Sequence, residues 1–396
     1  MRLSEETLPR LPDGIERFSY DRAAQATGIV HFGIGAFHRA HQAWYTDLAM
    51  DAGDRDWMIS GVSLRSPEVA EQMNPQGGLY TLCERSSEGI APRVIAAVRE
   101  VLVASQIPDR VVDLLAAPAT RIASFTITEK GYCRTPDGSL DMTLAGERSI
   151  FRFLSSGLAR RRAAGLPGLT LMSCDNLADN GRQFERLLGE YLEPRDAGLA
   201  RWVRDECAFP STMVDRIVPA TIEADRAEVE TLLGLRDEAA VMTEPFSQWV
   251  IEDRFAGDRP RWEAVGAELV SDVAPYETAK LRMLNGAHSA LAYLGLGHGH
   301  SFVHEAVADP GIRPLIERIM RQEAASSLVP APGQDLGAYT DALLDRFANQ
   351  ALQHRLAQIA MDGSQKIPQR WLATLAYHQR KSAHCLGIET AVAAWL

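Results

Sequence analysis

The stretch TGIVHFGIGAFH, residues 27–38, decides the class of fold. Residues 27–32 are mostly apolar or β-branched, which predicts a short buried strand. Gly33 and Gly35 follow directly, and the residues from there to about Met50 have a helical pattern. A strand, a glycine turn and a helix in this order are typical of a domain that presents the turn and the helix N-terminus to a pyrophosphate.

Strand-like runs recur along the next part of the chain, at residues 57–64, 121–127 and 169–173. The first begins about thirty residues after Thr27, which is the period of a βαβ unit. Helical patterns precede the other two. This alternation predicts an α/β fold with a doubly wound, mainly parallel sheet of the Rossmann type.

The pattern changes near residue 270, beyond which no segment has the pattern of a strand. Pro275 suits the first turn of a helix that we expect to run to about Leu294 and to stop at Gly295. A chain of 396 residues is also too long for one ordinary core. We therefore expect a dinucleotide-binding domain over residues 1–270 and a mainly α-helical substrate domain over 271–396. The apolar ending IETAVAAWL (388–396) has no C-cap, so we expect that second domain to be incomplete.

Composition excludes several classes of function. The formal net charge of −11 disfavours nucleic-acid binding, which needs clustered Lys and Arg. No apolar run approaches the roughly 18 residues of a membrane span, and the polar N-terminus does not resemble a signal peptide. The five cysteines are scattered without C-x-x-C spacing, which indicates reduced thiols and no metal site. We expect a cytoplasmic protein whose partner is a small molecule.

The first candidate site is the turn Gly33-Ile34-Gly35. The third glycine of the dinucleotide fingerprint is replaced by His38, and a purely structural strand–helix turn explains the pattern equally well. The second strand should end with an acidic residue that bonds the cofactor's ribose, but Arg65 and Ser66 stand there. They are compatible with NAD and also with the 2′-phosphate of NADP, or Arg65 is only a solvated loop residue.

The second candidate site is the segment ETAKLRMLNGAH, residues 277–288. At about 100° per residue of α-helix, the side chains of Glu277, Lys280, Asn285 and His288 share one broad arc that also contains Leu284. Burying these groups together is costly unless they bond one another or a ligand. Burial favours the neutral amine of a lysine, as a general base for an alcohol proton requires. A polar cluster that only fixes the helix to the sheet is the competing interpretation.

Three further segments carry candidate residues. SCDNLADNG (173–181) follows a predicted strand, so the amide of Asn176 lies where parallel sheets bind ligands, unless Asp175 or Asn176 only caps a helix. Lys130 follows another strand and could meet a substrate carboxylate or simply be exposed. Asp215 stands next to Arg216 in FPSTMVDR (209–216), and the alternative to a functional role is that the two residues are simply an ion pair.

Seven blocks, read in order, resemble the polyol-specific long-chain dehydrogenases, the mannitol dehydrogenase family. The resemblance runs from about Ile29 to the end of the chain. The blocks are GIGAFHRAHQ, TITEKGY, SCDNLADNG, FPSTMVDRIVP, EPFSQWVIEDRF, KLRMLNGAHSALAYLG and MDGSQKIPQR. The resemblance implies a dehydrogenase that uses NAD and no metal.

It also implies roles for the candidate residues. Lys280 would be the general base, while Asn176 and Asn285 would donate hydrogen bonds to the oxygen that is alternately hydroxyl, alkoxide and carbonyl. His288 would orient the substrate, and Glu277 would relay the proton towards solvent. Asp215 and Lys366 lie in blocks that line the family's substrate site.

Within the family, TITEKGY, FPSTMVDRIVP and MDGSQKIPQR look more like fructuronate reductase, because mannitol enzymes tend to have glycine in place of Lys130. A lysine there suits a substrate with a carboxylate. We therefore expect the interconversion of D-fructuronate and D-mannonate. The alternatives are a mannitol or arabinitol dehydrogenase, and a truncated homologue that binds the dinucleotide without catalysis.

Overall fold

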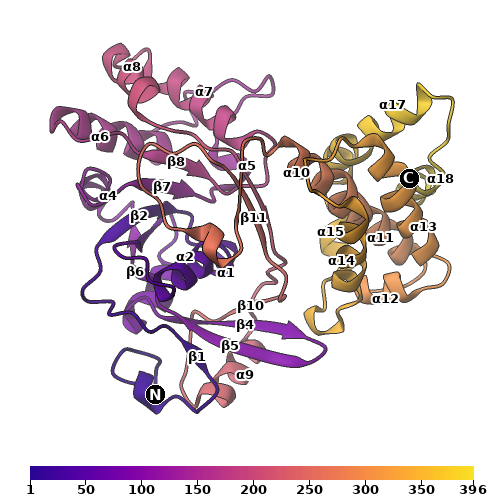
Figure 1. Ribbon diagram of the computed structural model, residues 1–396, viewed down its shortest axis with the longest axis horizontal. Coiled ribbons are helices and arrows are strands. Elements are labelled where there is room, and N and C mark those ends of the chain that lie inside the picture. Colours follow the sequence, from indigo (N-terminus) through magenta and orange to yellow (C-terminus); the bar gives the residue numbers. More distant parts are fainter. The chain divides into compact units, whose positions relative to one another are not determined.

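The computed structural model describes residues 1–396 and contains two compact units (Figure 1). The first consists of Met1–Glu84 and Ile90–Val273, and the second of Arg85–Gly89 and Ala274–Leu396. Each unit is described by itself.

The first unit is built on a five-stranded parallel sheet in the order β6-β3-β2-β7-β8. The strands are β2 (Thr27–Phe32), β3 (Met58–Ser63), β6 (Val98–Val103), β7 (Ile122–Phe125) and β8 (Thr170–Ser173). From β2 the chain extends the sheet through β3 to β6, then returns to the other side of β2 for β7 and β8. The direction of the sheet therefore switches between β2 and β7, which confirms the predicted Rossmann-type fold.

Alternate residues of the strands enter two different cores, as the period of a strand requires. Val30, Phe32 and Phe125 pack against the helices on one face. These helices are α4 (Pro108–Leu115), α6 (Ile150–Ala163), α7 (Asn180–Leu192) and α8 (Ala197–Glu206), which lie together in Figure 1. Ile29 and Ile59 belong to the other core, with α2 (Gln42–Asp51) and the short α1 (Ala36–Ala40).

The first unit also contains two small sheets that the sequence did not lead us to expect. One has the order β1-β5-β4-β10, with β1 at Glu16–Arg17, β4 at Tyr80–Ser86, β5 at Gly89–Ile95 and β10 at Val241–Thr243. The other has the order β12-β11-β9, with β9 at Thr212–Asp215, β11 at Gln248–Glu252 and β12 at Glu268–Val270. Most of these strands are short and pair with segments far away in sequence, so local periodicity does not reveal them.

The second unit is helical. Its central helix, α11 (Gly286–Gly297), is almost wholly buried and contacts α12, α15 and α18. The surrounding helices are α12 (Val303–Ala308), α13 (Arg313–Arg318), α14 (Leu336–Ala348), α15 (Leu356–Ala360), α16 (Gly363–Ile367), α17 (Ala373–Gln379) and α18 (Leu386–Trp395). No helix of the structure has both the length and the apolar character that a membrane span needs.

The expected helix from Pro275 exists but differs from the prediction in two ways. It starts as α10 (Ala274–Ala279), becomes a π-helix, η4, over Lys280–Asn285, and continues as α11 to Gly297. The assumption of a uniform 100° per residue was therefore wrong, because i→i+5 bonding places more residues in a turn. The predicted stop at Gly295 was also wrong. A β-carbon there would lie 2.6 Å from Leu356 of α15 and 2.8 Å from Ala306 of α12. Gly295 therefore lies within the helix and permits these two helices to pack closely against it.

Candidate functional site

The candidate residues that follow strands of the parallel sheet all lie at its carboxyl edge. Gly33, Ile34 and Gly35 follow β2, Arg65 and Ser66 follow β3, Lys130 follows β7, and Asn176 follows β8. In the sheet these four strands are consecutive neighbours. The structure thus gathers residues from four separate segments at the edge where open α/β sheets bind ligands.

The two glycines of the turn after β2 differ in their backbone conformation and in the space around them. Gly33 has φ +94°, and a β-carbon there would lie 2.0 Å from the Thr126 carbonyl oxygen. Gly35 has φ −76°, and a β-carbon there would meet nothing closer than 3.9 Å. Gly33 is therefore required by the fold, whereas Gly35 leaves an open stretch of backbone that a ligand can approach closely. Ile34 between them is buried against Gly61.

His38, which replaces the third glycine, is a buried neutral side chain. Its ring stacks on that of His31 with the centroids 3.4 Å apart, and neither of its ring nitrogens has a hydrogen-bond partner in the structure. Burial lowers the pKa of His38 well below its usual value and lowers that of His31 to about 3. The position of the third fingerprint glycine is therefore occupied by His38, one of two stacked, buried imidazoles.

Asp175 joins the loops that carry Lys130 and Asn176. Its carboxylate accepts hydrogen bonds from the N–H groups of Ile127 and Thr128, at 3.1 and 2.9 Å, and from the Tyr132 hydroxyl at 3.1 Å. The N-cap residue of α7 is Asp179, not Asp175 or Asn176 as the capping alternative supposed.

The exposed ends of these loops carry potential ligand groups. Lys130, in the short helix α5 (Thr128–Gly131), is exposed and forms no ion pair. Asn176 is exposed as well. Arg65 and Ser66 are both exposed, and Arg65 also forms no ion pair. These side chains are accessible to a ligand from solvent.

Asp215 is the last residue of β9 and is buried, with 4% of its surface exposed. Its neighbour Arg216 forms an ion pair with Glu84 and donates hydrogen bonds to the carbonyl oxygens of Ala40 and Glu244. Arg216 is thus a structural cation that joins distant segments of the first unit.

In the second unit, four of the five candidate residues lie on one continuous helix. Lys280 and Asn285 are the first and last residues of the π-helix η4, Glu277 lies in α10 and His288 in α11. Lys280 is only 7% exposed and His288 is buried, whereas Glu277 and Asn285 are half-buried. A π-helical turn is rare and occurs frequently at functional sites.

The electrostatic environment of His288 keeps it neutral. Burial lowers its pKa well below the usual value, and the positive charges of Arg346, Arg370 and Lys280 add to the effect. Its Nε2 is buried without a hydrogen-bond partner, and its ring contacts Phe347, with the centroids 4.7 Å apart. Leaving a buried imidazole nitrogen without a hydrogen bond costs free energy. Such an atom is expected where a bound ligand supplies the missing partner.

Sequence reasoning missed Arg370. This residue lies in the π-helix η8 (Pro368–Leu372), and its Nη1 donates to the Asn285 carbonyl oxygen at 3.0 Å and to Ser289 Oγ at 2.6 Å. Gly286 permits this packing, because a β-carbon there would already lie 3.1 Å from the Trp371 indole nitrogen. The signal available in the sequence was the position of Arg370 four residues, about one helical turn, after the candidate Lys366.

Lys366 makes bonds to main-chain oxygen atoms. Its Nζ donates to the carbonyl oxygen of Ile359, within α15, at 3.3 Å and to that of Met361, just beyond α15, at 2.6 Å. Burial, together with the charge of Arg370, lowers its pKa below the usual value. Lys366 therefore stabilises the loop before α16 in this structure.

The choice of basic residues is uneven. Of the 41 basic side chains only four are lysines, at positions 130, 280, 366 and 381. The first three are all candidate site residues. Arginine remains protonated in proteins and cannot accept a proton, whereas a buried lysine can.

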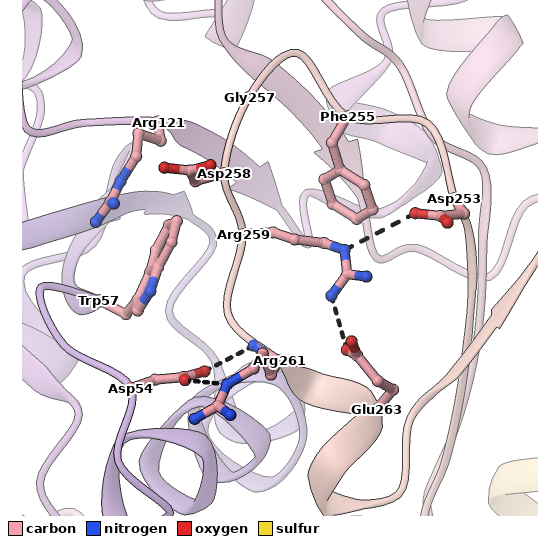
Figure 2. Close-up of a pocket in the computed structure, with 10 residues that line it drawn as sticks. All are labelled: Asp54, Trp57, Arg121, Asp253, Phe255, Gly257, Asp258, Arg259, Arg261 and Glu263. Atoms are coloured by element: carbon pink, nitrogen blue, oxygen red, sulfur yellow. Dashed lines mark hydrogen bonds and ion pairs between the residues drawn. The ribbon is translucent and has the colours of Figure 1, made fainter.

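A hollow of about 680 Å³ lies elsewhere in the first unit (Figure 2). Trp57 and Arg121, which stack on each other in its wall, immediately precede β3 and β7. The hollow is therefore at the amino edge of the parallel sheet, opposite to the candidate residues. Two of its three arginines, Arg259 and Arg261, pair with acids of its wall, as Arg261 does with Asp54 at 2.6 Å.

Comparison with known proteins gives consistent matches over both units. Residues 27–264 match the family description "Mannitol dehydrogenase Rossmann domain", and residues 272–396 match "Mannitol dehydrogenase C-terminal domain". The chain is 41% identical to the uncharacterized oxidoreductase YeiQ of Escherichia coli K12, over 98% of this chain and 82% of that protein.

Two further relatives have assigned activities. The chain is 40% identical to the D-mannonate oxidoreductase of E. coli K12, over 96% of this chain and 82% of that protein. The structure of Pseudomonas fluorescens mannitol 2-dehydrogenase, solved as a ternary complex with NAD and D-mannitol, superposes with a TM-score of 0.90 at 38% identity. That match covers 100% of this chain and 83% of the other.

Proposed function

Since this chain belongs to the mannitol dehydrogenase family and is an oxidoreductase, we propose that it transfers a hydride reversibly between NAD(H) and a C6 sugar acid, D-fructuronate or D-mannonate. The observation that carries the proposal is the burial of Lys280, which is only 7% exposed and begins a π-helical turn. The same helix carries the neutral His288, whose Nε2 has no hydrogen-bond partner. D-mannonate oxidoreductase, at 40% identity, supports the choice of a sugar acid.

The turn after β2 fits a dinucleotide. Gly35 leaves its backbone open, since a β-carbon there would have no neighbour closer than 3.9 Å, and a pyrophosphate needs such an approach. In this proposal Gly33, Ile34 and Gly35 hold the pyrophosphate, and Arg65 and Ser66 bind near the adenosine ribose. The unpaired guanidinium of Arg65 also suits a 2′-phosphate, so NADP is the alternative cofactor. When bound, the nicotinamide ring accepts or supplies the hydride.

Lys280 moves the proton in this mechanism. Burial disfavours the ammonium form of a lysine, so the amine can take the proton of the substrate hydroxyl as the C–H bond breaks. The amides of Asn285 and Asn176 donate hydrogen bonds that stabilise the alkoxide character of that oxygen without titrating. In the reducing direction Lys280 returns the proton to the carbonyl oxygen. Glu277, half-buried one helical turn before Lys280, exchanges the proton with solvent.

His288 and Lys130 determine which substrate is held. The neutral imidazole of His288 offers Nε2 to a substrate hydroxyl, which would satisfy a nitrogen that otherwise has no partner. Lys130 is an unpaired cation at the carboxyl edge of the sheet and suits the substrate carboxylate. Asp215 and Lys366 are proposed as further substrate contacts, the latter after release of its bonds to backbone carbonyl oxygens.

The base is tested with Lys280→Ala. Loss of a general base typically lowers the rate by about 10²- to 10⁴-fold. We expect kcat to fall by this amount near neutral pH, NADH binding to remain unchanged, and added primary amines to restore part of the rate. The matched control, Lys381→Ala, removes an exposed lysine whose Nζ bonds to the Tyr377 hydroxyl, and should behave as the parent. A Lys280→Ala enzyme that keeps its rate near neutral pH would refute the assigned base.

The substrate is tested by measuring turnover of D-fructuronate and D-fructose with NADH and with NADPH. We expect D-fructuronate with NADH to be preferred, and Lys130→Met to raise KM for the acid while leaving fructose unaffected. A strong preference for fructose would indicate a mannitol 2-dehydrogenase, which the relative at 38% identity also suggests, and oxidation of arabinitol would indicate the third candidate. An inactive parent that binds NADH would indicate a non-catalytic binding protein.

A further inference from the structure

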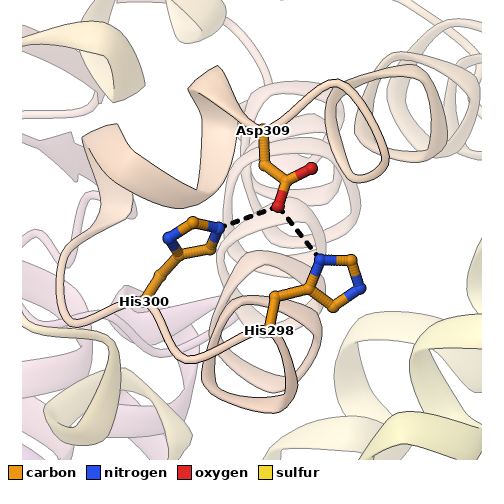
Figure 3. Close-up of side chains that lie close together, drawn as sticks. All are labelled: His298, His300 and Asp309. Atoms are coloured by element: carbon orange, nitrogen blue, oxygen red, sulfur yellow. Dashed lines mark hydrogen bonds and ion pairs between the residues drawn. The ribbon is translucent and has the colours of Figure 1, made fainter.

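A cluster of two histidines and one aspartate lies at the far end of the helix that carries Lys280. His298 Nδ1 is 3.0 Å from Asp309 Oδ2, and His300 Nε2 is 2.8 Å from the same oxygen (Figure 3). The three potential ligand atoms lie within 4.8 Å of one another. We propose that His298, His300 and Asp309 bind one divalent transition-metal ion of the zinc type.

Cysteine spacing, the pattern used above to look for metal sites, does not reveal this cluster. The three residues form an H-x-H pair followed nine residues later by an aspartate, and only the fold brings the aspartate to the pair. Imidazole nitrogen with carboxylate oxygen is a donor set that suits Zn²⁺, Co²⁺ and Ni²⁺ better than Ca²⁺ or Mg²⁺. Three protein ligands leave a fourth position for water.

The backbone fixes both histidines. Helix α11 ends in a Schellman motif, in which the His300 N–H donates to the Gly295 carbonyl oxygen at 2.9 Å and the Gly299 N–H to that of Leu296 at 3.1 Å. Gly299, between the histidines, has φ +86°, which a side chain would strain. This left-handed residue reverses the chain, so that both imidazoles face Asp309 (Figure 3). The positions of two ligands therefore follow from the end of the helix.

The aspartate is oriented as well. Asp309 Oδ1 accepts a hydrogen bond from the Gly311 N–H at 2.7 Å, which leaves Oδ2 for the imidazoles. Such an outer contact is what orients carboxylate ligands in metal sites. The nearby Glu305 accepts from the N–H groups of Ser301 and Phe302 at the start of α12 and is not a ligand.

A cation is favoured at this place for a further reason. The carbonyl end of a helix carries a partial negative charge, and α11 with η4 and α10 forms a continuous helix from Ala274 to Gly297. A metal ion here would join the end of α11 to Asp309, the residue that follows α12. Its effect would be to stabilise the second unit, at a distance along the helix from the proposed base, and the ion would take no part in hydride transfer.

The test uses the untagged full chain after treatment with a chelator. Titration with Co²⁺ should produce one equivalent of a visible absorption band that Zn²⁺ abolishes, and calorimetry with Zn²⁺ should give one site per chain. Zn²⁺ should also raise the thermal unfolding midpoint, because the ion binds the native state. His298→Ala, His300→Gln and Asp309→Asn should each weaken binding at least tenfold.

Two controls make the result specific. His384→Ala removes an exposed histidine that faces only Glu389, at 3.5 Å, and should leave metal binding unchanged. Circular dichroism and NADH binding establish that the variants fold. Absence of saturable binding in the parent would overturn the proposal, and so would binding that persists unweakened in the variant with all three ligands replaced. Both results are independent of the assigned enzymatic activity.

Discussion

Asp175 Oδ1 accepts a hydrogen bond of 2.9 Å from the backbone N–H of Thr128, and this bond ties the segment after β8 to the segment after β7. The residue after Asp175 is Asn176, and Lys130 lies two residues beyond Thr128. The bond therefore sets the relative positions of a proposed hydrogen-bond donor and a proposed carboxylate ligand. Thr128 has φ +61°, a left-handed conformation that such an anchor must hold.

Asp175→Asn should uncouple these two loops. The amide presents an NH₂ group to at least one of the donors that the carboxylate satisfies, so we expect kcat/KM to fall by about 10- to 100-fold, as small misplacements of site residues do. Stability should fall by about 1–3 kcal/mol in urea unfolding. Asp179→Asn, in the same loop at a left-handed position that asparagine tolerates, is the control and should change stability by less than about 0.5 kcal/mol. Unchanged kinetics in Asp175→Asn would contradict the coupling.

The two turn glycines should respond differently to alanine. Gly33→Ala adds a β-carbon 2.0 Å from the Thr126 carbonyl oxygen at φ +94°, so we expect a loss of at least about 2 kcal/mol in the free energy of unfolding. Gly35→Ala meets nothing within 3.9 Å and should unfold as the parent does, yet bind NADH more weakly. Urea unfolding and NADH fluorescence titration measure the two effects. Equal NADH affinity in Gly35→Ala would argue against pyrophosphate binding at this turn.

A second pair of glycines tests the packing of the helix that carries Lys280. Gly286→Ala places a methyl group 3.1 Å from the Trp371 indole nitrogen, so η8 must shift by a few tenths of an ångström. Because Arg370 of η8 bonds to Asn285 and Ser289, we expect kcat to fall with a small loss of stability. Gly297→Ala, in the last turn of the same helix with nothing within 4 Å, should leave kcat unchanged and increase stability by up to about 1 kcal/mol. Equal kcat values in the two variants would show that the contact with η8 does not affect the site.

Four histidines whose pKa values are lowered by burial of the ring predict that the protein loses stability in mild acid. Burial lowers their pKa values below that of an unfolded histidine, about 6.5, so as the pH falls through this value the unfolded chain binds protons that the native chain does not. The free energy of unfolding should then decrease with falling pH by up to about 1.4 kcal/mol per pH unit for each residue, between about pH 7 and pH 5.5. The residues are His31, His38, His288 and His354.

Urea unfolding across this pH range measures the slope. Asp47 and Asp237, whose pKa values burial raises, act in the opposite direction, so the share of one histidine is isolated by substitution. His31→Asn should reduce the slope by up to about 1.4 kcal/mol per pH unit, because the pKa of His31 is about 3. His384→Asn, at an exposed histidine, should leave the slope as it is. A slope that His31→Asn does not change would contradict the assignment.

Several features of the fold follow from the sequence because neighbouring residues encode them. The strand, glycine turn and helix of residues 27–50 have a local signature, and so does the helix that begins near Pro275. Four of the five strands of the parallel sheet are short apolar runs that the sequence pattern detects, whereas β6 was not predicted. Their carboxyl ends then place Gly35, Lys130 and Asn176 at one edge without further information.

Other features depend on pairs of residues that are distant along the chain. Strand β4 pairs with β10, whose residues lie about 160 positions later, and neither segment alone has a strong strand pattern. The bonds from Arg370 to Asn285 and Ser289, and the approach of Asp309 to the two histidines, likewise form only when separate helices pack.

The helix around Lys280 shows both kinds of information. The sequence by itself determined that Glu277, Lys280, Asn285 and His288 share one helix, since their spacing and the flanking apolar residues specify it. Only the tertiary structure decided that the middle of this helix is a π-turn and that His288 Nε2 lies buried without a partner. The physical reason is that hydrogen-bond register within a helix responds to the packing of neighbouring elements, here η5 (Ile319–Ala324) and η8, which the local sequence does not contain.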